Sequence, residues 1–437
     1  MPSLFGRSII DASTSAARSS RVPLIVFSHL RWGFVFQRPQ HLLTRLAREF
    51  DVFFVEEPVF DEGEPRLEAH VRAPGVEVLT PHTSSRAAGF HDDQMPQLQR
   101  LVATFSAERQ LIDPLVWFYT PMALPLLAAL EPRAVVYDCM DDLASFKFAP
   151  PELVQREASL MRLADIVLTG GPSLYEARKD RHENIHCLPS AVDAEHFAPA
   201  RLDGDDADGK AATTLHQGMA RPRLGFFGVI DERIDLELIA GIADRRPEWP
   251  IIMAGPVVKI DPASLPQRPN LHWIGMQRYD ALPHLLSQWD VCLLPFALNE
   301  ATHFISPTKT LEYLAGGKPV VSTRIRDVES LYGKAVRFGS NADEFVQAVE
   351  SLLARDAAEQ ARWRLDARTL VDNCTWDGTA ALIGEMLQAY VDPAPVDDII
   401  VASAAVPEPV ALPAVPAELL VAAASPTETH GIQPLAS

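Results

Sequence analysis

The sequence predicts two α/β domains, each built on a parallel sheet with helices on both faces. Three observations predict this class. From Val22 onward, short apolar runs alternate with amphipathic stretches, the runs are continuous in hydrophobicity, and the alternation stops once and then resumes. Continuous apolar runs indicate strands buried on both faces, and their alternation with helices indicates parallel pairing. The length of 437 residues suits two such domains.

The first domain is expected over residues 22–197. Strands are predicted at 22–28, 51–57, 76–81, 115–120, 134–140, 165–170 and 185–190, and helices at 38–49, 94–110, 151–164 and 172–181. Residues 198–221 are rich in Asp and Gly and have no apolar period, so we expect a linker whose acidic cluster is a solvated loop rather than a metal clamp.

The second domain is expected over residues 222–375. Strands are predicted at 223–228, 251–255, 271–275, 291–296, 319–323 and 335–338, and helices at 236–244, 279–289, 307–315 and 344–355. A last helix over 376–392 is expected to pack back on the first domain. The ends, 1–21 and 393–437, are expected to be disordered tails; the second is rich in Pro and Ala and has no aromatic residue.

Composition excludes several classes of function. A net charge of −19 argues against a protein that binds nucleic acid through clustered Lys and Arg. We find no apolar run long enough for a membrane-spanning helix and no apolar core of a secretory signal near the start. The four Cys are far apart and form no CxxC pair, which indicates buried thiols in a reducing cytoplasm.

The most informative stretch begins at Ser306. Ser306 is a good N-cap, and Pro307 suits the first position of a helix. The N–H groups at such a helix start favour an anion such as a diphosphate, and Thr308 and Lys309 would add a hydroxyl and a positive charge. Glu312 follows one turn later, where its carboxylate could accept hydrogen bonds from a ribose. An ordinary amphipathic helix with a solvated Glu is the alternative.

Polar residues after strands of the first domain are candidates for a second binding side of the cleft, which the resemblance described below identifies as the acceptor side. Gly33 lies in the first turn after a strand, where it would allow close approach of a substrate. Arg38 stands at a helix start and could face an anion, and His29 follows the first strand. Asp141, and after it Asp138, are our candidates for the base that takes a proton from an acceptor hydroxyl. The alternatives are a surface Arg, a structural His and an Asp that caps the next helix.

Five segments resemble one family in the right order. They are the segments 32–40 (WGFVFQRPQ), 135–143, 164–174, 189–197 and 305–323. Together they resemble glycosyltransferases of the GT-B fold, which have two Rossmann-like domains facing a cleft. The resemblance is narrower to group 1, family-4-like bacterial enzymes of the teichuronic-acid type, which make surface polysaccharides.

This resemblance implies a function and its partners. It implies transfer of a sugar from a nucleotide-diphospho-sugar to a hydroxyl of a glycan or lipid-linked acceptor, without a metal or other cofactor. Gly228 and Arg233 join the donor-binding candidates on this basis. We expect a cytoplasmic enzyme, with peripheral contact at the inner face of the membrane and the oligomeric state left open.

Two departures from the family pattern keep other functions open. Many relatives carry a Glu-x7-Glu pair; with Glu312 as its second member, the first position is Phe304. Many also carry Arg and then Lys after the glycine of the second domain's first strand, whereas Gly228 is followed by VIDERID. The alternatives are a non-catalytic GT-B-like protein that binds a glycan or partner, and a nucleotide-sugar epimerase on the same architecture.

Overall fold

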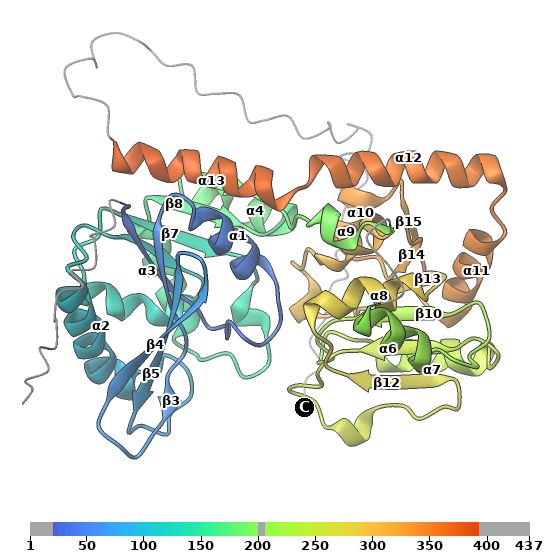
Figure 1. Cartoon of the computed structure of the whole chain (residues 1–437), viewed down its shortest axis with the longest axis horizontal. Coiled ribbons are helices and arrows are strands. Elements are labelled where there is room, and N and C mark those ends of the chain that lie inside the picture. The colour runs from blue at the N-terminus through green and yellow to red at the C-terminus, as the bar shows by residue number, and fades with distance from the viewer. Residues whose placement is uncertain (1–20, 200–205, 393–437) are drawn as a thin grey trace, which may run out of the picture. The chain divides into compact units, whose positions relative to one another are not determined.

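The computed structural model describes residues 21–199 and 206–392, which belong to one compact unit with two sheets (Figure 1). We call the first sheet and its helices the N-terminal lobe, and the second sheet and its helices the C-terminal lobe. The tails predicted at 1–21 and 393–437 lie outside the described residues, apart from Arg21.

The N-terminal lobe is built on a mostly parallel sheet in the order β3-β5-β2-β1-β6-β7-β8-β9, with β4 antiparallel on β5. Its strands are β1 (Pro23–Phe27), β2 (Asp51–Val55), β3 (Val59–Phe60), β4 (Arg66–Ala73), β5 (Val76–Thr83), β6 (Leu115–Phe118), β7 (Ala134–Cys139), β8 (Ile166–Thr169) and β9 (Ile185–Cys187). The seven predicted strands are present. The sequence prediction missed β3 and β4, which are largely exposed.

Both faces of this sheet are buried, as continuous apolar strands require. In β1, Leu24 and Val26 pack in one core, while Ile25 and Phe27 pack in the core on the opposite face. The helices of the lobe are α1 (Arg38–Leu46), α2 (Met95–Arg109), α3 (Leu153–Leu163) and α4 (Pro172–Arg178).

The C-terminal lobe is built on an all-parallel sheet in the order β12-β11-β10-β13-β14-β15. Its strands are β10 (Leu224–Phe227), β11 (Ile251–Ala254), β12 (Leu271–Gly275), β13 (Val291–Leu294), β14 (Val320–Ser322) and β15 (Val336–Phe338). Its helices are α7 (Leu236–Arg245), α8 (Leu282–Ser287), α9 (Lys309–Ala315), α10 (Arg326–Tyr332), α11 (Ala342–Leu353) and α12 (Ala357–Asn373). This is the doubly wound order, in which ligands bind where the strand order reverses, here between β10 and β13.

The expected linker contains a helix, which corrects the prediction of a loop. After α5 (Ala194–Phe197), helix α6 spans Ala207–Leu215 and is capped by Asp206, whose Oδ1 accepts from Gly209 N at 2.6 Å. Asp208 pairs with Arg278, so two of the acidic residues have a structural role. Helix α6 buries only Gly209 and Ala212, so its apolar face is too narrow to give a helical pattern in the sequence.

The last helix, α13 (Trp376–Val391), packs on the first sheet, as Figure 1 shows. Trp376, Ile383 and Leu387 are buried in the same core as Leu24. The Trp376 ring stacks on His41 of α1 with the ring centroids 4.9 Å apart. The chain therefore returns to its first lobe after completing the second.

Candidate active site

A cavity of about 90 Å³ lies where loops from the two lobes meet. The N-terminal lobe contributes residues that follow β7 and β8 or begin α1, and the C-terminal lobe contributes residues that follow β10 and β13 or lead into α9. The lining residues are Gln37, Arg38, Met140, Asp141, Gly170, Ser190, Val229, Arg233, Phe296, Ile305, Ser306, Pro307, Thr308 and Lys309. Six of them are candidate site residues from the sequence: Arg38, Asp141, Arg233, Ser306, Thr308 and Lys309.

Lys309 is the cavity's cation without a carboxylate partner. Within the described residues its ammonium makes no hydrogen bond or ion pair, although it begins α9 and lines the cavity. Burial lowers the pKa of Lys309, Glu312 raises it and Arg233 lowers it further. Gly228, with φ of 142°, makes room for this side chain, because a Cβ there would overlap the lysine stem. An anion in the cavity would relieve the cost of burying this charge.

Arg233 is held by a carboxylate of its own loop. Its Nε lies 2.9 Å from Oδ1 of Asp231 and its Nη2 lies 2.7 Å from Oδ2. Its guanidinium also lies 5.4 Å from the ring centroid of Phe146 in the N-terminal lobe. Because Asp231 offsets its charge, Arg233 supplies directed donors more than net charge.

Asp141 faces these two cations from the N-terminal lobe. Burial raises the pKa of Asp141 to about 6, while the positive charges of Arg233 and Lys309 lower it. Its neighbour Asp142 fixes the loop, accepting from Ser145 Oγ at 2.5 Å and from Arg178 Nη2 at 2.8 Å. A carboxylate with this pKa is ionised near neutral pH and can accept a proton from a hydroxyl.

Asp138 does not face the cavity, which corrects its prediction as the second candidate base. It is fully buried and accepts from Arg38 Nε at 2.9 Å. Arg38 also donates from Nη1 to Leu188 O at 2.9 Å, while its buried Nη2 has no partner within the described residues. Asp138 therefore positions Arg38, and Arg38 remains in the cavity wall.

The helix expected from Pro307 begins later, at Lys309, so Ser306 is not its N-cap. Thr308 occupies that position without a side-chain bond to the helix. Ser306 lies in the loop before α9, and its O accepts from Ser190 Oγ at 2.9 Å. Ser306 Oγ is buried without a partner in the described part of the chain. Both Ser306 and Thr308 still line the cavity.

Glu312 lies outside this cavity, buried on α9. Burial raises the pKa of Glu312 to about 7, and Lys309 lowers it. Its charge in turn contributes to the raised pKa of Tyr279, whose buried hydroxyl has no partner among the described residues. Contact of Glu312 with a ribose stays a prediction.

His29 and Gly33 are not brought to the cavity. Burial, followed by the charge of Lys259, lowers the pKa of His29 to about 4, so it is a neutral, half-buried side chain. Gly33 is exposed, and a Cβ there would meet open space. The close approach that suggested Gly33 is therefore not required by the fold.

Contacts between the lobes border the cavity, and few sequence signals predicted them. Asp327, at the start of α10, accepts from Ser173 N of α4 at 3.0 Å. A Cβ on Gly171 would overlap the Asp327 carboxylate and lie 2.8 Å from Ser306 Cβ. The adjacent glycines at 170 and 171 were the one available signal, because such pairs mark close backbone approach.

Sequence comparison matches the C-terminal lobe to one family. Residues 221–355 match the model of glycosyl transferases group 1. A putative teichuronic acid biosynthesis glycosyltransferase, TuaH of Bacillus subtilis, is 25% identical over 279 residues, covering 59% of this chain and 68% of TuaH. The C-terminal lobe carries a group 1 glycosyltransferase domain. These matches favour the transferase over the epimerase and the non-catalytic binder weighed from the sequence.

Solved structures show that this glycosyltransferase has the GT-B fold. Sucrose-phosphate synthase of Thermosynechococcus elongatus aligns with a TM-score of 0.65 at 14% identity, covering 85% of this chain and 99% of that one. HepE of Anabaena, in complex with UDP-glucose, aligns with a TM-score of 0.59 at 16% identity, covering 84% and 99%. A trehalose-phosphate synthase of Burkholderia xenovorans, in complex with glucose-6-phosphate, gives 0.59 at 13% identity, covering 84% and 100%.

Two kinds of feature are absent from residues 21–199 and 206–392. No helix in these ranges is long and apolar enough to cross a membrane. Nor do three or more His, Cys, Asp or Glu side chains gather there as metal ligands would. The metal-free mechanism expected from the family resemblance stays a prediction.

Proposed function

We propose that the enzyme transfers a sugar from a nucleotide-diphospho-sugar to a hydroxyl of a glycan or lipid-linked acceptor during bacterial surface polysaccharide biosynthesis. The observation that carries this proposal is the unpaired Lys309 ammonium facing Asp141 across the cavity. Lys309 suits the leaving diphosphate and Asp141 suits the acceptor proton. The similarity to TuaH supports the polysaccharide role.

The transfer can be written with these groups. The bond between the anomeric carbon and the diphosphate oxygen breaks, and a bond forms between that carbon and the acceptor oxygen. The acceptor proton passes to the Asp141 carboxylate, and Lys309 with the directed N–H groups of Arg233 neutralises charge on the departing diphosphate. Side chains rather than a metal would then stabilise the negative charge of the leaving diphosphate.

The cavity volume limits which part of the proposed donor could enter it. Water occupies ~30 Å³ in the liquid, so about 90 Å³ accommodates a phosphate-sized group and not a nucleoside. The nucleoside would lie beyond the cavity, and Glu312, one turn along α9 from Lys309, is the proposed ribose ligand.

The test is a donor screen followed by product analysis. UDP-, GDP- and ADP-sugars are compared by thermal shift, and a ligand at ~100 times its Kd raises stability by ~2.7 kcal/mol. UDP-glucose comes first because HepE was solved with it. We expect one nucleotide class to stabilise the enzyme, and Glu312→Ala to remove that stabilisation. No response to any nucleotide would contradict the proposal, and loss of turnover in EDTA would contradict the metal-free step.

A further inference from the structure

A second cavity, of about 450 Å³, lies beside the candidate active site. It is lined by Ser145 of the N-terminal lobe and by residues from two stretches of the C-terminal lobe, 298–304 and 324–326. Its volume falls in the range of small-ligand pockets, roughly 300–1,000 Å³. The larger cavity therefore has the room for a sugar ring that the smaller one lacks.

The two cavities share their walls. Phe304 lines the larger cavity and the next residue, Ile305, lines the smaller one. In the other lobe, Asp141 lines the smaller cavity and Ser145, in the loop that Asp142 fixes, lines the larger one. A ligand in the larger cavity would thus lie beside the wall that carries Asp141, as an acceptor must.

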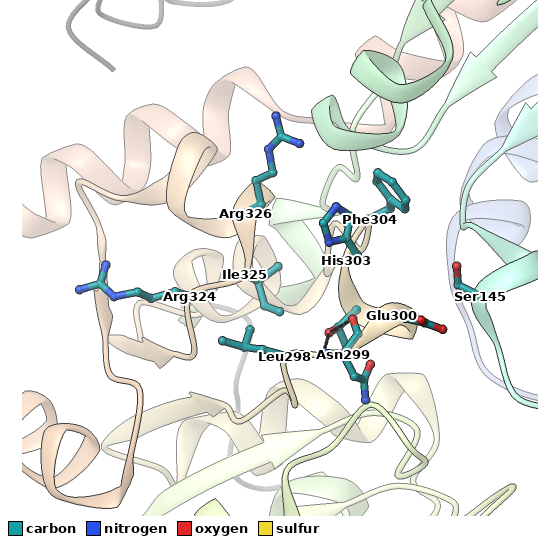
Figure 2. A pocket seen from close by; sticks show the side chains of 10 residues that line it. Ser145, Leu298, Asn299, Glu300, His303, Phe304, Arg324, Ile325 and Arg326 are labelled. Atoms are coloured by element: carbon teal, nitrogen blue, oxygen red, sulfur yellow. Dashed lines mark hydrogen bonds between the residues drawn. The ribbon is translucent and has the colours of Figure 1, made fainter. Parts of the chain in front are cut away.

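The side chains of the larger cavity combine an aromatic surface with polar groups. The Phe304 and His303 rings pack edge to face, with centroids 4.5 Å apart. Figure 2 shows Asn299 and Glu300 nearer to Ser145, with the Glu300 carboxylate directed toward it. Amide and carboxylate oxygens accept hydrogen bonds from hydroxyls, and a few such groups around an aromatic surface are typical of small-ligand sites.

Two arginines in this cavity differ in their partners. Arg324 donates to Glu329 at 2.5 Å and lies 5.8 Å from the Phe338 ring centroid. Arg326 is exposed and makes no hydrogen bond or ion pair in residues 21–199 and 206–392. In Figure 2 the two side chains leave Ile325 in different directions, with Arg326 on the side of Phe304. Arg326 is therefore the arginine available to a ligand.

We propose that the larger cavity binds an acceptor sugar that carries an anionic group, a carboxylate or a phosphate, and that Arg326 recognises that group. The aromatic pair would pack on the sugar ring while the exposed Glu300 carboxylate accepts from its hydroxyls. The assignment of this sugar as the acceptor rests on the proposed function.

The test measures binding rather than turnover. Glucose, glucuronate, glucose 6-phosphate and inorganic phosphate are titrated by calorimetry into the wild-type enzyme and into Arg326→Gln, Arg324→Gln and Lys309→Met. Arg324→Gln is the matched control, because it removes the same charge from the same cavity wall. Both arginines are exposed, so we expect the melting temperatures to stay within a few degrees of wild type. Glucuronate tests for recognition of a carboxylate, and glucose 6-phosphate tests for recognition of a phosphate.

We expect one anionic sugar to bind about tenfold or more tightly than glucose, since hydrogen bonds to charged groups contribute ~1.5–3 kcal/mol. Arg326→Gln should remove this preference, whereas Arg324→Gln and Lys309→Met should keep it. Equal binding of glucose overturns the proposal, as does a preference that survives Arg326→Gln or is lost in Lys309→Met. Equal binding of inorganic phosphate shows a bare anion site and also overturns it.

Failure of the proposed function gives a different result. If no nucleotide sugar binds the enzyme while an anionic sugar binds through Arg326, the donor assignment fails and the sugar site stands. If UDP binds through Lys309 while no anionic sugar is preferred, the transfer stands and the anionic-sugar site fails.

Discussion

The cations around the small cavity differ in how much of their charge a ligand can use. Arg38 is paired with Asp138 and Arg233 with Asp231, so a carboxylate already offsets the positive charge of each arginine. Lys309 has no such partner in the described part of the chain, and burial lowers its pKa. A buried ammonium of this kind gains most from an incoming anion, because the anion offsets its desolvation.

Replacing Lys309 by Met should therefore weaken binding of UDP by tenfold or more, since charge-assisted hydrogen bonds contribute ~1.5–3 kcal/mol. Calorimetry with UDP measures the effect. Lys334→Met is the matched control: Lys334 is exposed and does not line either cavity, so the same loss of charge should leave affinity within about twofold. Equal weakening in both variants would show a general charge effect and remove Lys309 from the donor site.

The raised pKa of Asp141 predicts how activity and stability depend on pH. As the base, Asp141 must be ionised, so kcat/KM should fall as pH decreases through about 6. Its pKa in the folded state lies above the ordinary value of 3.8. The folded state therefore binds more protons between about pH 4 and 6, and stability rises as pH falls through this window. Asp141→Asn should abolish transfer yet raise stability at pH 7 by on the order of 1 kcal/mol.

Melting temperatures from pH 4 to 8, alongside initial rates, measure both effects. Asp142→Asn is not a control, since Asp142 holds the loop through Ser145 and Arg178. Full transfer rate in Asp141→Asn would exclude it as the base. Reduced stability of that variant at pH 7 would show that the carboxylate is needed for the fold.

At the scale of elements, one glycine determines how closely two helices approach across the cavity. The N–H of Ser173 in α4 bonds to Asp327 at the start of α10, and Gly171 leaves space for that carboxylate and for Ser306. Any side chain at this position must push the two segments apart. Catalytic groups from the two lobes would move apart with them.

Gly171→Ala should therefore lower kcat by about tenfold or more, because misplacement of ~1 Å can cost up to ~100-fold. UDP affinity should change much less if the nucleotide contacts mainly the C-terminal lobe. Gly33→Ala is the matched control, since a Cβ at Gly33 meets open space, and it should retain wild-type kcat. A normal kcat in Gly171→Ala would show that this contact is not part of the active arrangement.

Elements with strong apolar patterns were predictable, and those without them were not. The continuous run of β1 required burial on both faces, which the two cores confirm. Helix α12 buries only Trp363, Ala367 and Val371, one residue every turn, and this narrow stripe was missed. Asp141 and Lys309 were predictable because they follow strands. The burial of Asp138 depends on Arg38, 100 residues away in sequence, and no local pattern reports such a pair.

At the scale of the whole molecule, the acidic surface and the cationic cavity have separate effects. The net charge of −19 is that of the entire sequence, whereas the Lys309 ammonium acts at short range in the cavity between the lobes. Salt screens exposed charges beyond about 8–10 Å but affects buried ones less. A small anionic substrate thus needs only the positive charge near Lys309. The overall negative charge of the protein therefore argues against binding of a nucleic-acid polymer but not against binding of a nucleotide.

The last prediction concerns the balance between open and closed arrangements of the two lobes. A diphosphate in the cavity would contact Lys309 and Arg233 on one side and lie close to Arg38 on the other, so it should favour the closed form. The Ser173 amide reports this closure, since its N–H bonds to buried Asp327 only when the lobes meet. UDP should therefore slow hydrogen exchange in peptides covering Ser173, by a factor that grows with UDP concentration. Gly171→Ala should bind UDP without this slowing, because its Cβ blocks the contact. If UDP binds the wild-type enzyme and exchange at Ser173 does not change, the Ser173–Asp327 contact is not coupled to the donor site.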